Sequence, residues 1–194
     1  MRVNGTSRRA SRRVGVHVRH FEGYLTPASP AGSRHCRFTS RALDVAGSDA
    51  DCVDWTHVRA AVVGASLHGG RHQRAADLFV REHVDELNAH PSAFFSVSLA
   101  ANSQLRSERG EVAQIASKLP AHAGWYPREF ACVAGRLAYT KYGLLTRLVM
   151  KRIARRHGAP TDTTRDYEFT NWDDVVRLAD AVVRMVAASG REAA

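Results

Sequence analysis

The sequence predicts an α/β fold in which helices cover a parallel sheet. Short apolar runs alternate along the chain with amphipathic segments of helical period, which is the pattern of repeated strand–helix units. The apolar runs carry apolar side chains on both faces, as a sheet covered on two sides requires. Apolar residues make up 44% and charged residues 24% of the 194 residues, which is the composition of one globular domain.

Four apolar runs predict the strands of this sheet. They are short, bounded by glycine, proline or polar residues, and rich in Val, Phe and Ala, as buried strands are. In chain order they cover residues 58–63, 93–99, 130–134 and 167–170. The first run ends at Gly64 and the third ends at Gly135, so we expect the chain to leave the sheet at these glycines.

Three amphipathic segments predict the helices. Residues 71–89 repeat apolar side chains at steps of three and four before Pro91, and residues 108–119 do so before Pro120. A final helix follows the last strand, with Thr170 as its N-cap. The side chains that we expect to be buried are Ala76, Phe79, Val80, His83 and Leu87 in the first helix, Val112, Ile115, Ala116 and Leu119 in the second, and Val175, Ala179, Val182, Val183 and Val186 in the third.

The first 50 residues do not fit this pattern. A strand of about five apolar residues should open a parallel α/β domain, but only Met1 and Val3 are apolar before Asn4. Residues 7–41 are rich in Arg, Ser, His, Gly and Pro. We therefore divide the chain into a divergent basic N-terminal segment, 1–50, and an α/β domain, 51–194, which contains a basic insertion at 136–165. A disordered basic arm and a pair of regular elements are both open interpretations of the segment.

The net charge of +9 comes from two short segments. Residues 1–43 carry +8, residues 136–165 carry +7, and the rest of the chain is mildly acidic. No apolar run reaches the roughly 18 residues of a membrane-spanning helix, and the N-terminus has no secretory signal. The three cysteines form no metal-binding or disulfide pattern. These features predict a cytoplasmic protein.

Two loops follow predicted strands where an open α/β sheet binds its ligands. Residues 64–70, GASLHGG, are small enough to let the backbone approach a flat ligand, although a tight turn explains them equally well. Residues 96–103 follow the next strand, and an ordinary polar loop explains them on their own. His68 and His72 stand four residues apart without a third ligand at a supporting spacing, so we predict no metal site.

The two basic segments offer candidate anion sites. Residues 5–11 place hydroxyls and arginines near a possible helix start, where free N–H groups bind anions. Residues 136–157 combine leucines at helical steps with a cluster of arginines and lysines. For this second segment, a packed helix with a basic end and a surface that docks to an anionic substrate or membrane are equally open.

Four stretches resemble the menaquinone-dependent protoporphyrinogen IX dehydrogenases, which are built on a flavodoxin fold. They are VVGASLHGGRHQ (62–73), FVREHVDELNAHPSAFFSVSL (79–99), FACVAGRLAYTKYGLLTRLVMKRIAR (130–155) and TDTTRDYEFTNWDDV (161–175). The resemblance implies a three-layer flavodoxin-like sandwich with strand order 2-1-3-4-5, in which the first strand and helix of this chain are degraded or irregular.

The resemblance also implies an activity and its partners. FMN would be the cofactor, protoporphyrinogen IX the substrate and menaquinone or another quinone the electron acceptor, in heme biosynthesis. The protein would be cytoplasmic and peripheral on the inner membrane surface, with no nucleic acid as a partner. An electron-carrying flavodoxin and a remnant that has lost FMN are the alternatives, and the acidic charge usual for simple flavodoxins argues against the carrier.

The family motifs assign candidate site residues by position. Those that would bind the phosphate are Thr6, Ser7 and Ser11, those that would flank the flavin ring are Ala65, Ser66, Leu67, His68 and Gly69 on one side and Ser96, Val97, Ser98 and Leu99 on the other, and those that would dock substrate or membrane are Arg136, Lys141, Arg147, Lys151 and Arg152. No side chain is assigned a catalytic or metal-binding role, because hydride passes directly to the flavin.

The phosphate motif departs from the family pattern, since Arg9 stands where the family has glycine. One hypothesis explains the departure and the odd composition together: residues 8–41 are read in a shifted frame of GC-rich DNA. In this hypothesis GTS is the last in-frame piece and LDVAGSDAD the first after the shift.

Overall fold

A four-stranded sheet in the order β2-β1-β3-β4 forms the centre of the computed structural model, which describes residues 41–46, 53–156 and 159–192. β1 (Ala61–His68), β3 (Ser92–Val97) and β4 (Glu129–Val133) run parallel, with Ala61 opposite Ser92 and Ala93 opposite Glu129. β2 (Arg71–His72) is a short antiparallel strand beside the end of β1. The predicted α/β class with a parallel sheet is confirmed.

The strand order agrees with part of the expected one. β1, β3 and β4 stand in the order expected of strands 3, 4 and 5, and β2 pairs only with the last two residues of β1 on its other edge. The first expected strand and the irregular first helix fall on residues outside the described ranges, and around the expected second strand only residues 41–46 are described, with a single bridge residue at Leu43.

Two predicted element boundaries are wrong at β1. The strand begins at Ala61 instead of Val58, after the single turn of η2 (Trp55–His57), and it continues through Gly64 to His68. Gly64 is needed for packing, because a Cβ there would lie 2.1 Å from Cζ of Phe95 on the neighbouring strand. The chain leaves the sheet only at Gly69 and Gly70, which have φ of 57° and 77°.

The first helical segment is two helices instead of one. α1 (Arg74–Glu82) starts three residues later than predicted, because Arg71 and His72 are used in β2. The chain breaks at His83 (φ −117°, ψ 27°), and α2 (Val84–Ala89) follows. Ala76, Phe79, Val80 and Leu87 of the predicted apolar face are buried, whereas His83 is only half-buried at the break.

The other two helices end or begin differently from their predictions. α3 (Arg106–Ala123) continues past Pro120, which lies in its last turn, and ends at the left-handed Gly124. α5 (Trp172–Glu192) is capped by Asn171, whose Oδ1 accepts a hydrogen bond from Asp173 N at 3.1 Å. The predicted cap, Thr170, is wrong by one residue, because the helix begins at Trp172 and the residue just before it is Asn171. Val186 is buried in the stripe that we predicted on this helix, whereas Ala179 is exposed.

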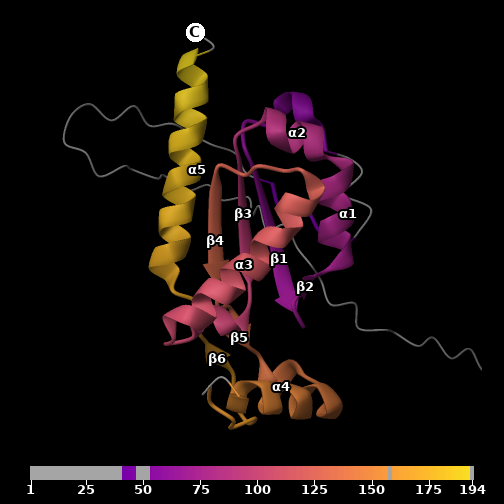
Figure 1. Cartoon of the computed structure of the whole chain (residues 1–194), viewed down its shortest axis with the longest axis vertical. Coiled ribbons are helices and arrows are strands. Elements are labelled where there is room, and N and C mark those ends of the chain that lie inside the picture. The colour runs from indigo at the N-terminus through magenta and orange to yellow at the C-terminus, as the bar shows by residue number, and fades with distance from the viewer. Residues whose placement is uncertain (1–40, 47–52, 157–158, 193–194) are drawn as a thin grey trace, which may run out of the picture.

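The main core lies where α1, α2 and α3 meet the sheet. Its largest fully buried side chains are Trp125, Phe94, Leu87, Val63 and Val80. Val45, from the short described stretch at 41–46, is also buried in this cluster. α1 and α3 contact each other, and α5 packs along β4 at the edge of the sheet (Figure 1). Within the described residues, no helix is both long and apolar enough to cross a membrane.

A second, smaller unit interrupts the chain between β4 and α5. It contains β5 (Arg136–Leu137), η4 (Tyr139–Lys141), α4 (Leu144–Arg156) and β6 (Tyr167–Glu168). β5 and β6 form an antiparallel ribbon, so the fourth predicted strand, 167–170, is shorter than expected and is not part of the main sheet. A core of Leu137, Tyr139 and Ala154 holds the unit together. We call residues 136–168 the insertion. It lies beyond the end of the sheet at which the parallel strands finish (Figure 1).

Candidate functional site

The carboxyl ends of the parallel strands gather the loops that we predicted to flank a flat ligand. β1 and β3 are neighbours, with Ala65 opposite Ser96 and Ser66 opposite Val97. The residues that follow each strand therefore emerge side by side at one edge of the sheet. This is the edge at which open α/β sheets bind ligands.

The segment after β1 is a β-hairpin and not a loose loop. Leu67 pairs with His72 and His68 with Arg71, so Gly69 and Gly70 form the turn. A Cβ added to either glycine would meet no atom within 4 Å, so positive φ, not crowding, is what requires glycine here. The tip of the hairpin is thus bare backbone facing open space.

His72 fixes this hairpin to the sheet. Its Nε2 lies 3.0 Å from the hydroxyl of Ser96, which is fully buried in β3. Its ring also meets the edge of Phe94, with 5.4 Å between the ring centroids. Burial lowers the pKa of His72, so the imidazole is neutral at pH 7. The sequence analysis considered His72 only as a metal ligand and missed this positioning role.

The predicted ring-flanking residues divide into two groups by exposure. Ala65 and Ser96 are buried in the sheet, where their side chains face protein. The remaining residues are half-buried or exposed at the edge: Ser66, Leu67, His68, Gly69, Val97, Ser98 and Leu99. The residues of this second group are the predicted ones that a ligand at this edge could touch.

The segment after β3 is ordered by its own hydrogen bonds. Ser98 N donates to Val133 O at 2.9 Å, which joins the end of β3 to the end of β4. A short 3₁₀ turn, η3 (Leu99–Asn102), follows, and the Ser103 hydroxyl donates to Glu108 at 2.6 Å. The segment after β3 is therefore held at its beginning by β4 and at its end by α3.

A cavity of about 310 Å³ is lined in part by η3, through Ala101 and Asn102. Its lining includes Asn102, Arg109, Cys132, Phe169 and Asp174. A smaller cavity of about 120 Å³ adjoins it and shares Asn102 and Phe169. Burial raises the pKa of the Cys132 thiol, so this group is protonated at neutral pH. No local sequence pattern indicates the larger cavity, because its walls come from three distant segments.

The predicted docking residues of the insertion have two different roles. Arg136 pairs with Asp166, and Arg147 donates to the backbone oxygens of Tyr139 and Tyr142. These two arginines hold the insertion together. Lys141 and Arg152 are exposed, and within the described part of the chain neither makes a side-chain hydrogen bond or ion pair. Lys151 is half-buried near the carboxylate of Asp162.

Asp166 is the polar anchor of the insertion. Its Oδ1 accepts hydrogen bonds from both the N–H and the hydroxyl of Thr140 at 2.8 Å, and its Oδ2 pairs with Arg136. The two Thr140 hydrogen bonds, and then Arg136, lower the pKa of Asp166. The sequence analysis did not single out this residue.

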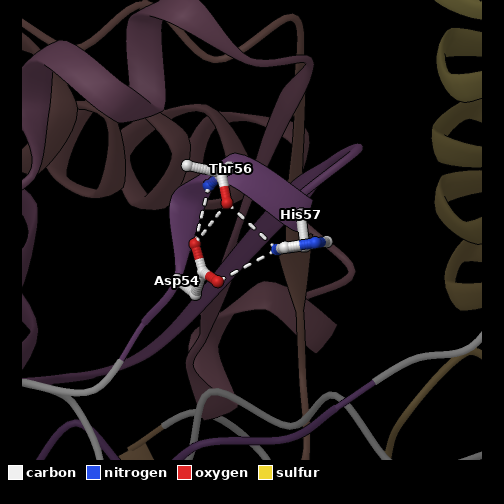
Figure 2. Close-up of polar contacts among 3 residues, drawn as sticks. All are labelled: Asp54, Thr56 and His57. Carbon is white, nitrogen blue, oxygen red and sulfur yellow. Dashed lines mark hydrogen bonds and ion pairs between the residues drawn. The ribbon is translucent and has the colours of Figure 1, made fainter.

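A hydroxyl, an imidazole and a carboxylate meet at Thr56, His57 and Asp54 (Figure 2). The Thr56 hydroxyl donates to Asp54 Oδ1 at 2.6 Å, and His57 Nδ1 lies 2.9 Å from Asp54 Oδ2 and 3.0 Å from Thr56 Oγ1. A catalytic relay needs the hydroxyl on one ring nitrogen and the carboxylate on the other, but here both meet Nδ1. The cluster precedes β1, at the opposite end of the sheet, and it caps η2.

The three phosphate-binding candidates, Thr6, Ser7 and Ser11, lie outside the described residues.

Comparisons with known proteins agree on one family. A flavodoxin-domain family matches residues 34–164. The protoporphyrinogen IX dehydrogenase [quinone] of Escherichia coli strain K12 is 31% identical over 131 residues, which cover 68% of this chain and 72% of the relative. The protein of that name from Leishmania major is 33% identical over 118 residues, which cover 61% of this chain and 51% of the relative. No solved structure matches the chain.

Proposed function

The chain belongs to the flavodoxin-domain family of the protoporphyrinogen IX dehydrogenases [quinone], and from that premise we propose that it oxidises protoporphyrinogen IX to protoporphyrin IX. The proposed cofactor is FMN, and the proposed electron acceptor is a quinone such as menaquinone. The proposed pathway is heme biosynthesis. The observation that carries the proposal is the similarity over 131 residues to an enzyme of that name.

The edge formed by the β1–β2 hairpin and the segment after β3 has features that suit a flavin ring. Flat aromatic ligands need close backbone approach, and the Gly69–Gly70 turn provides bare backbone with open space around it. Ser66, Leu67, His68 and Gly69 would hold one side of the ring, and Ser98 and Leu99 the other. When bound, FMN supplies the two-electron acceptor that takes hydride from a substrate carbon and passes electrons to a quinone.

The protein's own contribution is positioning and the exclusion of water. His72 keeps the hairpin against β3 through Ser96, so the two ring-flanking segments stay at a fixed separation. The insertion lies beyond the same edge of the sheet and would cover the substrate there (Figure 1). Lys141, Lys151 and Arg152 are the insertion cations that would meet the substrate's propionates or lipid phosphates, because Arg136 and Arg147 serve the internal structure.

The phosphate site depends on the N-terminal segment. Thr6, Ser7 and Ser11 would bind the phosphate of FMN, with Arg9 in the place of the motif's glycine. We retain the proposal that residues 8–41 are read in a shifted frame. It is supported by their composition, and the family match, which begins at residue 34, covers only the last eight of these residues. Translation of the gene in its other two frames tests it, and the idea fails if neither frame yields an amphipathic helix with acidic residues.

The function is tested by two measurements on the full chain. Purified protein titrated with FMN should acquire a bound-flavin absorbance spectrum, and the loaded protein should sustain the oxidation of protoporphyrinogen IX over many turnovers only when a quinone is supplied to reoxidise the flavin. Protein that binds FMN but leaves the porphyrinogen unchanged would be a flavin electron carrier. Protein that stays colourless would be a remnant of the family without its cofactor.

A further inference from the structure

The outward side of α4 carries four exposed apolar side chains in a row. Leu144, Leu145, Leu148 and Val149 are 83%, 82%, 68% and 56% exposed. We call these four residues the α4 apolar face. Large exposed apolar patches on soluble proteins mark sites of interaction with other molecules.

The orientation of α4 is fixed by its other side. Ala154 is fully buried in the core of the insertion, and Met150 packs against that core. Arg147 further ties the helix to the backbone of Tyr139 and Tyr142. The helix therefore cannot turn its apolar face inward without losing this core.

Apolar and basic side chains separate along the helix and not around it. The α4 apolar face occupies the first turns, and the exposed Arg152 and Arg155 continue the same side in the later turns. The exposed Lys141 stands just before the helix. The sequence has no acidic residue between Glu129 and Asp162, so the whole surface favours an anionic partner.

The shape of this surface selects the kind of partner. Small ligands bind in concave sites, but no α4 residue lines either of the two cavities described above. A second copy of the chain would bring one insertion of charge +5 against another. A lipid bilayer with anionic headgroups accepts a convex helix with apolar side chains at one end and arginines at the other.

We propose that α4 is an interfacial helix whose apolar face enters an anionic lipid bilayer. The leucines and Val149 lie at the boundary of headgroups and acyl chains, and Lys141, Arg152 and Arg155 reach lipid phosphates with their long side chains. α4 lies beyond the carboxyl ends of the strands (Figure 1), so docking brings the hairpin edge toward the membrane. The use of this docking to reach a lipid-soluble quinone rests on the proposed function, whereas the docking itself rests on α4.

Vesicle sedimentation of the full chain tests the proposal. The probe is phosphatidylcholine vesicles with and without about one third phosphatidylglycerol. We expect the wild type to sediment with the anionic vesicles and to be released by high salt. The double variant Leu144→Glu/Leu148→Glu should bind at least about tenfold more weakly, because it places carboxylates where the apolar side chains enter the lipid. Arg152→Glu/Arg155→Glu should weaken binding and its salt dependence together.

Matched controls lie at the other end of the sheet. Tyr126→Ser removes an apolar side chain that is 78% exposed, and Arg59→Glu reverses an exposed charge just before β1. Both should sediment as the wild type does. Circular dichroism checks that every variant is folded, and a probe Leu148→Trp should shift its emission to the blue only with anionic vesicles.

Three results would overturn the docking. The first is equal binding of the leucine variant and the wild type, and the second is equal binding to vesicles with and without phosphatidylglycerol. The third is a dimer in light scattering that Leu144→Glu/Leu148→Glu dissolves, since a second copy would then cover the face. Vesicle binding without porphyrinogen oxidation would remove the proposed function and leave the docking in place.

Discussion

The molecule has two cores that differ in how they are held together. The core of the sheet is made of Trp125, Phe94, Leu87 and other large apolar side chains, drawn from several helices and strands. Among the described residues of the insertion, its core has three buried members, Leu137, Tyr139 and Ala154, and it depends on the hydrogen bonds of Asp166 and Arg147 as well. The sheet core can therefore define the fold, whereas the insertion is a small unit that uses polar anchors and leaves apolar side chains outside.

The largest effect should come from breaking the sheet core at Phe94. Phe94 is fully buried between Trp125, Phe130 and His72, so Phe94→Ala should lower the free energy of unfolding by about 3–5 kcal/mol. Urea denaturation measures the loss. Phe130→Ala is the matched control, because Phe130 is 39% exposed and its loss should be clearly smaller. Equal losses would mean that Phe94 is not the centre of this core.

The same kind of change in the insertion should act locally. Leu137 is 1% exposed, so Leu137→Ala should cost the insertion about 2–4 kcal/mol. We expect hydrogen exchange to speed up in α4 while amides of β3 keep their protection. Leu144→Ala, at an 83% exposed position, should change neither. Faster exchange in β3 as well would show that the two cores unfold as one unit.

A smaller effect should appear when the polar anchor is titrated. The pKa of Asp166 is lowered in the folded chain, so its contribution is present above the ordinary value of about 3.9 and is lost as the pH falls through the folded value. Exchange protection of α4 should thus weaken in acid below about pH 4. Asp166→Asn should loosen α4 already at neutral pH and flatten this acid dependence.

The control for this titration is Asp180→Asn on α5, which should leave the pH profile of α4 unchanged. A wild-type profile that is already flat in acid would show that the ion pair and the Thr140 hydrogen bonds do not hold the insertion.

Local patterns were sufficient to predict the architecture. Alternating apolar runs and helical periods identified every parallel strand of the described sheet and the buried side of α1. The pattern could not locate the end of β1, because Gly64 is explained by the ring of Phe95 on the next strand and not by a turn. The break at His83 is not marked by a glycine or proline in the sequence. The cap at Asn171 is a local hydrogen bond, but Thr170 beside it is also a preferred cap residue, so the pattern did not decide between the two.

The site was predicted only in part, for a similar reason. The sequence identified the two segments at the carboxyl edge, because strand ends are visible in it. It could not show that Ala65 and Ser96 face the interior, or that His72 bonds to a residue 24 positions away. On a helical wheel the leucines and arginines of α4 overlapped, and only the buried Ala154 revealed which side faces out.

The two ends of the insertion lie side by side, just after the end of β4. Arg136 and Glu168 are opposite each other in the β5–β6 ribbon, and Phe169 N donates to Gly135 O at 3.0 Å. Chain segments whose two ends adjoin are the ones that domains gain or lose without rerouting the rest of the chain. A short turn from Gly135 to Phe169 could therefore replace residues 136–168. The surface chemistry of this protein can change without any change to its sheet.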